Sequence, residues 1–279
     1  MILSIASGKG GTGKTTIAVN LGLSLNHPVQ YLDCDVEEPN GHIFLNPVFE
    51  ESIEQMIPIP DVDKERCTAC GKCAQICQYN AIVLIKDNVL VFPELCHSCA
   101  GCWLVCPENA VHQKQKEIGL VERGMANNIS FVHGKLKLGE VLAPPLIKSV
   151  KKSIKSNSVN IIDAPPGTSC PVIEAINNSD FVLLVTEPTP FGLNDLILAV
   201  EMVRKLKIPF GVIINRSDIG DDRVIEYCKK ENIQIMLEIK NDRKIAEAYS
   251  KGIPLVEIYP EYKDNFLKLF SQIERRVSK

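Results

Sequence analysis

The sequence lacks the usual marks of a membrane or exported protein. Its 279 residues contain no apolar run of about 18 or more residues, the length that a membrane helix needs. The first residues, MILSIASGKG, lack the basic start and the small-residue cleavage site of a signal peptide. The chain also lacks a strong net charge. Its net charge of −3 gives no bulk electrostatic reason to bind nucleic acid. We therefore expect a cytoplasmic protein with no nucleic-acid partner.

Histidine is scarce and cysteine is abundant. The five histidines show no ligand spacing such as H-x-x-x-H, so we interpret them as ordinary polar residues. The eleven cysteines are many for a chain in a reducing compartment. Regular cysteine spacing in such a compartment indicates metal binding rather than disulfides.

Short apolar runs alternate with helical patterns along most of the chain. Helices are expected near 139–154, 194–206 and 221–231, and IGLVERG with ISFVHGKL is typical of a hairpin. Apolar runs that alternate with helices predict an α/β fold, with a mostly parallel sheet covered by helices on both faces. The expected strands are 1–7, 28–35, 159–167, 180–188, 209–216 and 233–239.

A glycine-rich stretch, SGKGGTGKTT, follows the first expected strand. It contains G-x-x-x-x-G-K-[ST] as Gly8, Gly13, Lys14 and Thr15, the phosphate-binding loop of nucleotide-hydrolysing proteins. Glycines let successive backbone N–H groups approach phosphate, and the helix that follows adds its positive end. Lys14 is expected to bridge the β- and γ-phosphates, and the Thr15 hydroxyl to coordinate Mg²⁺. The stretch carries a second lysine, Lys9.

A repeated cysteine segment interrupts the α/β pattern. CTACGKCAQICQYNAI (67–82) aligns with CHSCAGCWLVCPENAV (96–111), with every cysteine in register. Each half has the spacing of bacterial two-cluster ferredoxins, in which the fourth cysteine of each run ligates the other cluster. We therefore expect an inserted α+β ferredoxin domain at 58–113, within an ATPase domain formed by 1–57 and 114–279.

The crossed pattern predicts two 4Fe–4S clusters. One would take Cys67, Cys70, Cys73 and Cys106, and the other Cys77, Cys96, Cys99 and Cys102. Pro107 follows the second run as in ferredoxins, whereas Gln78 replaces proline after the first. A pair of zinc sites is the alternative, but zinc sites rarely use crossed fourth ligands.

Three further cysteines are isolated. Cys34, Cys170 and Cys228 are read by default as packing residues, because buried free cysteine usually acts as a small hydrophobe. Cys170 lies seven residues after Asp163, a spacing that resembles the cluster ligand of the nitrogenase iron protein. A third cluster between two subunits is the less favoured interpretation.

The motifs together resemble those of one family. K-G-G-x-G-K-T-T is similar to the deviant Walker A loop of MinD/ParA-type ATPases. DCD (33–35) and DAPPGT (163–168) resemble their two switches, INR (214–216) their base-recognition strand end, and 239–254 the stretch that closes over the base. The whole chain resembles MinD-superfamily ATPases that contain an inserted ferredoxin domain.

The resemblance implies a role for each matching residue. Lys9 would reach across an ATP-sandwich homodimer to the partner's phosphates, and Asp35 would orient the attacking water and help to hold Mg²⁺. Asp163 would hold Mg²⁺, the Gly167 N–H would sense the γ-phosphate, and Asn215 would bind adenine. Asp33 competes with Asp35, since only one acid can be best placed. The expected catalytic residues are Lys9, Lys14 and Asp35, and the expected ATP site comprises Gly8, Lys9, Gly10, Gly11, Thr12, Gly13, Lys14, Thr15, Thr16, Gly167 and Asn215.

Three functions fit these features. The favoured one is an Mg²⁺-dependent ATPase that couples nucleotide state to electron transfer or to metallocofactor maturation with a partner protein. A MinD-like positioning protein is the second, with 262–279 as an amphipathic membrane helix, although a docked C-terminal helix explains that pattern more simply. The third is an iron–sulfur scaffold of the Mrp type, which the lack of a further C-x-x-C outside the two runs makes less favoured. Because the insert follows Asp35, we expect it to respond to nucleotide, unless it tumbles independently on a tolerant loop.

Overall fold

A nine-stranded sheet forms the centre of the computed structural model, which describes residues 1–278. Its order is β11-β10-β9-β1-β8-β2-β7-β6-β3, and the seven strands from β11 to β7 are parallel. The bounds of the strands are β1 (Ile2–Ala6), β2 (Val29–Asp33), β3 (Val48–Val62), β4 (Ile82–Ile85), β5 (Asn88–Val91), β6 (Val111–Ala126), β7 (Ile129–Leu136), β8 (Val159–Asp163), β9 (Phe181–Thr186), β10 (Phe210–Asn215) and β11 (Ile235–Ile239).

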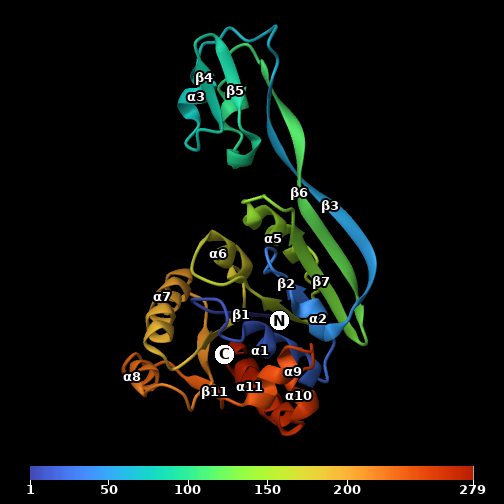
Figure 1. The fold of residues 1–279 in the computed structure, drawn as a ribbon, viewed down its shortest axis with the longest axis vertical. Helices are drawn as coiled ribbons and strands as arrows, with labels where there is room; N and C mark the ends of the chain where they lie inside the picture. The colour runs from blue at the N-terminus through green and yellow to red at the C-terminus, as the bar shows by residue number, and fades with distance from the viewer. Residues whose placement is uncertain (279) are drawn as a thin grey trace.

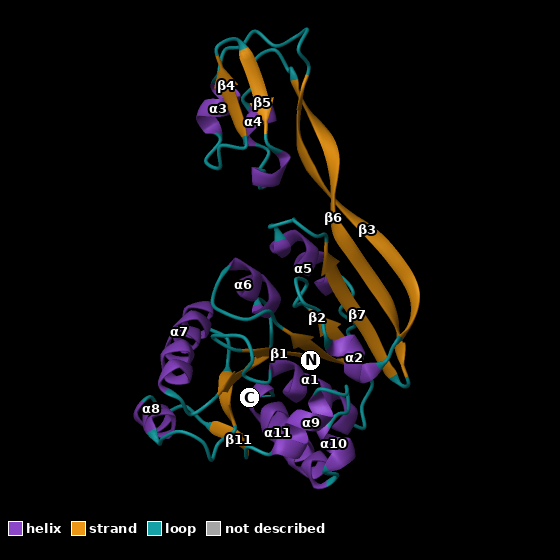
Figure 2. Ribbon diagram, viewed as in Figure 1, coloured by secondary structure: helices purple, strands orange, loops and turns teal. Residues whose placement is uncertain are grey.

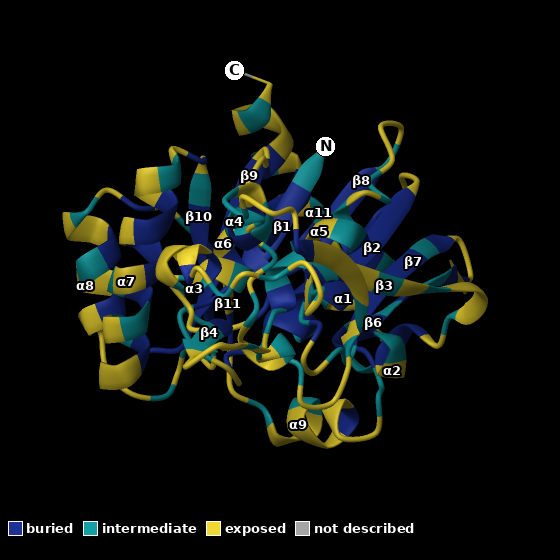
Figure 3. Ribbon diagram, turned by 90° about the horizontal axis from the view of Figure 1, so that it is seen from above, coloured by how far each residue is buried: buried dark blue, intermediate teal, exposed yellow. Residues whose placement is uncertain are grey.

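Helices cover both faces of this sheet, as the sequence predicts (Figure 2). The bounds are α1 (Lys14–Ser24), α2 (Gly41–Leu45), α3 (Lys72–Ile76), η1 (Pro93–Leu95), α4 (Gly101–Leu104), α5 (Ala143–Lys151), α6 (Cys170–Ile176), α7 (Pro190–Leu206), α8 (Arg223–Lys230), α9 (Arg243–Tyr249), α10 (Leu255–Ile258) and α11 (Glu261–Val277). One apolar core lies between the sheet and α5–α8, and a second lies between the sheet and α1, α10 and α11. Figure 3 shows the strands buried between helices that expose their outer faces.

The segment that contains the two cysteine runs forms a small unit at one end of the molecule (Figure 1). It contains α3, α4 and the antiparallel pair β4–β5, and it has its own apolar cluster that includes Cys73, Ile82, Cys102 and Val111. β3 and β6 carry this unit as a two-stranded antiparallel ribbon. The predicted boundaries at 57/58 and 113/114 fall inside these two strands, so a paired ribbon rather than a loop joins the unit to the body.

The predicted hairpin is present and longer than expected. β6 pairs antiparallel with β7 from Gly119 to Ala126, and β7 pairs parallel with β2. The ribbon is therefore continuous with the main sheet up to Gly119. A side chain at Gly119 would place its Cβ 2.3 Å from the Lys135 carbonyl oxygen, which explains why glycine stands where β6 leaves β7.

The C-terminal helix α11 is docked on the body. Its apolar side chains Phe266, Leu269, Phe270 and Ile273 are all buried, in the same core as α1. The docked interpretation of this helix is therefore confirmed. No helix within residues 1–278 is both long enough and apolar enough to cross a bilayer.

Candidate functional site: a nucleotide cavity and two cysteine cavities

The glycine-rich loop lies between the end of β1 and the start of α1. Gly11 and Gly13 have φ angles of 80° and 96°, which favour glycine, and Gly13 precedes the first residue of α1, Lys14. A Cβ at Gly8 would lie 2.2 Å from the Asp195 carbonyl oxygen, so glycine there also lets α7 approach. The loop thus leads directly into a helix N-terminus, which is the geometry that binds phosphate.

A cavity of about 430 Å³ opens beside this loop. One end is formed by the glycine loop and the first residues of α1, together with Asp35 and Pro166. The other end is formed by Asn215, Arg216 and a stretch from Ile239 to Tyr249. A polar end with loop N–H groups and a partly apolar far end suit a phosphate chain attached to a base.

Buried oxygen atoms collect at the phosphate end. The Thr15 hydroxyl donates to Asp163 Oδ2 at 2.6 Å, and the Tyr31 hydroxyl donates to the same oxygen at 2.9 Å. Asp163 is 1% exposed, and within residues 1–278 its Oδ1 has no hydrogen-bond partner. An unpartnered carboxylate oxygen beside a threonine hydroxyl fits a Mg²⁺ site, since this ion prefers oxygen ligands.

Asp33 and Asp35 differ in role, although they are two residues apart. Asp33 is fully buried and accepts hydrogen bonds from the backbone N–H groups of Asp35, Asn40 and Gly41. It therefore holds the turn that follows β2. Asp35 is partly exposed and lines the nucleotide cavity. This difference favours Asp35 for the catalytic role.

The carboxylates of this site ionise reluctantly. Burial raises the pKa of Asp163, and the nearby Lys14 ammonium opposes that rise. Burial and the neighbouring Asp163 raise the pKa of Asp33. For Asp35, burial raises the pKa to about 6, against the opposing charge of Lys14. A divalent cation bound among these carboxyl groups would favour their charged forms and oppose the rise of each pKa.

The eight cysteines of the two runs line two further cavities in the small unit. One is lined by Cys67, Cys70, Cys73 and Cys106, and the other by Cys77, Cys96, Cys99 and Cys102. Within residues 1–278, no three His, Cys, Asp or Glu side chains are placed to chelate a single metal ion. Each quartet instead surrounds a small cavity, and it combines three cysteines of one run with the last cysteine of the other.

Comparison with known proteins assigns the chain to a family. Residues 3–255 match the family model of the CobQ/CobB/MinD/ParA nucleotide binding domain. The chain belongs to this family. An uncharacterized protein of Methanocaldococcus jannaschii is 31% identical over 275 residues, which cover 95% of this chain and 93% of that protein.

Other members of the family share less sequence. The iron-sulfur cluster carrier protein of Pyrococcus horikoshii is 26% identical over 282 residues, which cover 91% of this chain and 78% of that protein. Among solved structures, the septum site-determining protein MinD of Pyrococcus horikoshii, complexed with Mg-ADP, has a TM-score of 0.61 and 21% identity, with 98% of this chain and 95% of that one covered. This last likeness shows that the body has the MinD-like fold.

The structure brings most of the residues expected for a nucleotide-binding domain together. The cavity wall includes Gly10, Gly11, Gly13, Lys14, Thr15, Thr16, Asp35 and Asn215. Gly8, Lys9, Thr12 and Gly167 are not part of that wall. The Gly167 N–H donates to the Ser7 carbonyl at 3.0 Å, and the Asn215 amide donates to the Thr12 carbonyl at 2.9 Å. Asn215 therefore braces the loop of this nucleotide-binding domain in addition to facing the cavity.

Sequence reasoning missed Tyr31, which is fully buried on β2. Alternation along a strand places residues 31 and 33 on the same face, so the acid at 33 was the available signal. Arg216 was named only as the last residue of INR and was given no role; its guanidinium lies 2.9 Å from Glu187, and Arg216 lines the cavity.

Two of the histidines interpreted from the sequence as ordinary polar residues make specific contacts. The His42 and His133 rings lie 5.5 Å apart, and His133 Nε2 lies 2.8 Å from Glu122 Oε2 on β6. Burial lowers the pKa of His133, and Glu122 opposes this. These contacts join α2, which follows Asp35, to the ribbon.

The isolated cysteines divide into two kinds. Cys34 and Cys228 are buried in the core, and burial raises the pKa of Cys228 to about 11, so their packing interpretation is confirmed. Cys170 is exposed at the start of α6, so the packing interpretation is wrong for this residue. It follows a turn of small and polar residues that leaves the core, which explains its exposure.

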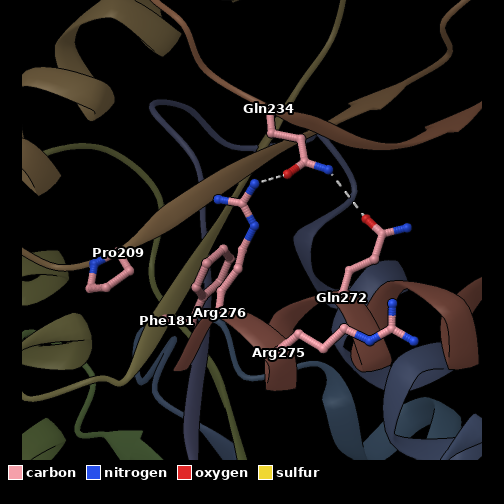
Figure 4. Close-up of a pocket in the computed structure, with 6 residues that line it drawn as sticks. All are labelled: Phe181, Pro209, Gln234, Gln272, Arg275 and Arg276. Carbon is pink, nitrogen blue, oxygen red and sulfur yellow. Dashed lines mark hydrogen bonds between the residues drawn. The ribbon is translucent and has the colours of Figure 1, made fainter. Parts of the chain in front are cut away.

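Another hollow lies at the amino ends of the parallel strands, opposite the glycine loop (Figure 4). It is lined by Phe181, Pro209 and Gln234, at the amino ends of β9, β10 and β11, and by Gln272, Arg275 and Arg276 of α11. Ligands of open parallel sheets bind at the carboxyl ends of the strands, where the glycine loop lies. This hollow is therefore not the nucleotide site.

Proposed function

We propose that this protein is an Mg²⁺-dependent ATPase that carries two 4Fe–4S clusters, and that its nucleotide state controls electron transfer or metallocofactor maturation. The observation that carries the proposal is the pair of cysteine cavities, each lined by one complete crossed quartet. They stand on a ribbon whose first strand starts thirteen residues after the nucleotide-facing Asp35. One chain therefore combines a nucleotide site with two cluster-binding cavities.

In the ATPase part, each residue has a role that its position supports. Lys14, at the first position of α1, would neutralise the β- and γ-phosphates, and Thr15 with Asp163 would hold Mg²⁺. Bound Mg²⁺ would supply charge neutralisation for the transferring phosphoryl group. Asp35 would orient water at the open side of the cavity, while Asp33 keeps the turn in place.

ATP-dependent dimerisation is the next part of the proposal. Lys9 is partly exposed and lies outside the cavity of its own chain, which supports a role toward the phosphates of a second copy. A lysine supplied in trans would act as an arginine finger does in other phosphoryl transfers.

The Lys9→Ala variant tests this part. It should bind ATP with nearly unchanged affinity, yet stay monomeric with ATP and lose hydrolysis at least about a hundredfold, as removal of a trans cation does. Light scattering with a non-hydrolysable ATP analogue and phosphate release measure the two effects. Lys14→Ala is the matched control, since it should lose binding itself. A monomeric Lys9→Ala protein with full activity would contradict the role in trans.

The cluster part of the proposal makes a specific statement about crossed ligation. Clusters would supply one-electron redox chemistry, and soft thiolates are their ligands. The crossed pattern implies that Cys73 and Cys106 serve one cluster, whereas Cys102 serves the other.

Double variants test this crossing. Anaerobically purified protein should hold about eight irons, and Cys106→Ser about four. Cys73→Ser added to Cys106→Ser should cost no further iron, because both hold the same cluster, whereas Cys102→Ser added to Cys106→Ser should remove nearly all of it. Iron and sulfide analysis with visible absorbance measures the result. The opposite pattern would show uncrossed quartets, and one zinc ion per quartet would replace the cluster proposal.

An iron–sulfur carrier is the second candidate, and the relatives that bear that name favour it. Its clusters would leave the protein for an apo-acceptor, whereas redox clusters would cycle and stay. Mixing iron-labelled protein with an apo-ferredoxin and ATP, then separating the two, distinguishes the candidates. A pull-down under anaerobic conditions with ATP-bound Asp35→Asn protein would identify the redox or maturation partner.

A further inference from the structure

One partly buried ion pair joins the small unit to the body. The Lys116 ammonium on β6 lies 2.6 Å from Glu140 Oε2, in the loop between β7 and α5. The side chains are only 20% and 5% exposed, so water screens this pair much less than a surface pair. Lys116 Nζ also donates to the Pro93 carbonyl at 3.2 Å.

The Pro93 carbonyl belongs to the turn that carries Cys96. The Cys96 N–H donates to the same carbonyl at 3.3 Å, so the ammonium and the Cys96 backbone share one acceptor. The Ser98 hydroxyl donates to the Pro58 carbonyl on β3. Cys96 itself packs against the apolar core of the body that includes Ile57 and Ile59. The Cys96 turn is therefore fixed to the ribbon and the body.

The other end of this contact leads back to the nucleotide cavity. Val36, the residue after Asp35, accepts a hydrogen bond from the Leu136 N–H at 2.8 Å. The next residue, Lys137, donates its N–H to the Ile118 carbonyl on β6 at 2.9 Å and accepts from the Glu140 N–H at 2.9 Å. A short series of backbone bonds thus runs from Asp35 to the loop of Glu140.

We propose that Lys116 is a positioning residue that links the segment after Asp35 to the Cys96 turn, through Glu140. This inference rests on the proposed function. It makes the quartet of Cys77, Cys96, Cys99 and Cys102 the one that responds to nucleotide. The ammonium also places positive charge beside this quartet, and net charge around a cluster sets its reduction potential.

Hydrogen exchange tests the link without relying on the clusters. In the wild-type chain, a non-hydrolysable ATP analogue with Mg²⁺ should slow exchange several-fold at 36–46 and also at 94–98. In Lys116→Met and in Glu140→Gln, the slowing should persist at 36–46 and be lost at 94–98. Lys116→Arg should restore it, and Lys114→Met, an exposed lysine on the same strand, should behave as wild type. Because Lys116 and Glu140 lie on different elements, a folding defect at one of them leaves the other variant to decide.

A redox titration followed by electron paramagnetic resonance gives an independent readout. Loss of the Lys116 charge should make the midpoint potential of one cluster more negative and leave the other unchanged, because an added electron loses a nearby cation. Unchanged potentials in Lys116→Met, together with retained slowing at 94–98, would overturn the inference. Absence of iron, or no nucleotide effect at 36–46 in the wild type, would instead contradict the proposed function, so the two failures are distinguishable.

Discussion

Three carboxyl groups lie close together at the phosphate end of the nucleotide cavity, and each has a raised pKa caused first by burial. Asp33 accepts hydrogen bonds from backbone N–H groups, and Asp163 accepts them from two hydroxyl groups, whereas Asp35 faces the cavity. Without Mg²⁺ and nucleotide, ionisation of these groups costs folding free energy. Binding of the proposed Mg²⁺ would offset this cost.

The Asp35→Asn variant tests this cost. A raised folded-state pKa means that the native protein holds the proton more tightly than the unfolded chain, so the contribution to stability is complete at low pH and is lost as pH rises through about 6. In Mg²⁺-free buffer, the variant should unfold like wild type at pH 4 and be more stable at pH 7.5. The rise from 3.8 to about 6 limits the gain to about 3 kcal/mol, at about 1.4 kcal/mol per pKa unit.

Urea unfolding at the two pH values measures the difference between the proteins. Mg-ADP should stabilise wild type at pH 7.5 more than it stabilises Asp35→Asn. Equal stabilities of the two proteins across the pH range would show that Asp35 ionises freely.

At the same scale, the sequence predicted some residues well and others not at all. The places of Lys14, Thr15 and Asp163 were predictable because the loop motif and strand ends fix them, and the crossed quartets were predictable because the spacing matches that of two-cluster ferredoxins. The different positions of Asp33 and Asp35 were not predictable, because they depend on which backbone N–H groups the turn at Asn40 and Gly41 directs at Asp33. Tyr31 and the Lys116–Glu140 pair depend on contacts between strands that no local pattern records.

At the scale of elements, α11 illustrates how the same amphipathic pattern has two readings. Its apolar face packs in the same core as α1, so this face cannot contact a membrane while the helix stays docked. The alternating strands and helices of the body were predictable, because each pattern is local. The length of β3 and β6 was not, since cross-strand pairing rather than composition extends them through the predicted domain boundary.

Phe266→Ala tests the docked role of α11. Phe266 is fully buried, and loss of such a side chain should destabilise the protein by about 3–5 kcal/mol. Lys268→Ala, at an exposed position of the same helix, should change stability by less than about 0.5 kcal/mol. Thermal unfolding measures both, and anionic vesicles with ATP should leave the wild-type chain in the aqueous fraction. Flotation of the wild type with vesicles would support the membrane alternative instead.

At the scale of the whole molecule, the small unit has an apolar cluster of its own, and the ribbon and the contact of Cys96 with the core of the body join the two units. The body should therefore fold without the cysteine unit. Val62 and Val111 face each other at the end of the ribbon, so a two-residue Asn-Gly turn can connect them in place of residues 63–110.

The shortened protein should remain folded and bind Mg-ADP with an affinity within about threefold of wild type, since no residue that lines the nucleotide cavity is removed. It should hold no iron. Calorimetric titration and iron analysis measure the two properties, and the full-length chain prepared in parallel is the control. Loss of nucleotide binding would show that the cysteine unit supports the body directly.

The ribbon leaves the main sheet at Gly119 and ends at Val111, a distance of about 26 Å at about 3.3 Å per residue. If the contacts of the small unit with the body open, such an arm would act as a lever whose pivot lies beside the segment after Asp35. A tilt of about 10° at the pivot would move its tip by about 4–5 Å over that length. A small movement of the segment after Asp35 would then become a displacement of the tip that is large enough to dock or release a protein surface.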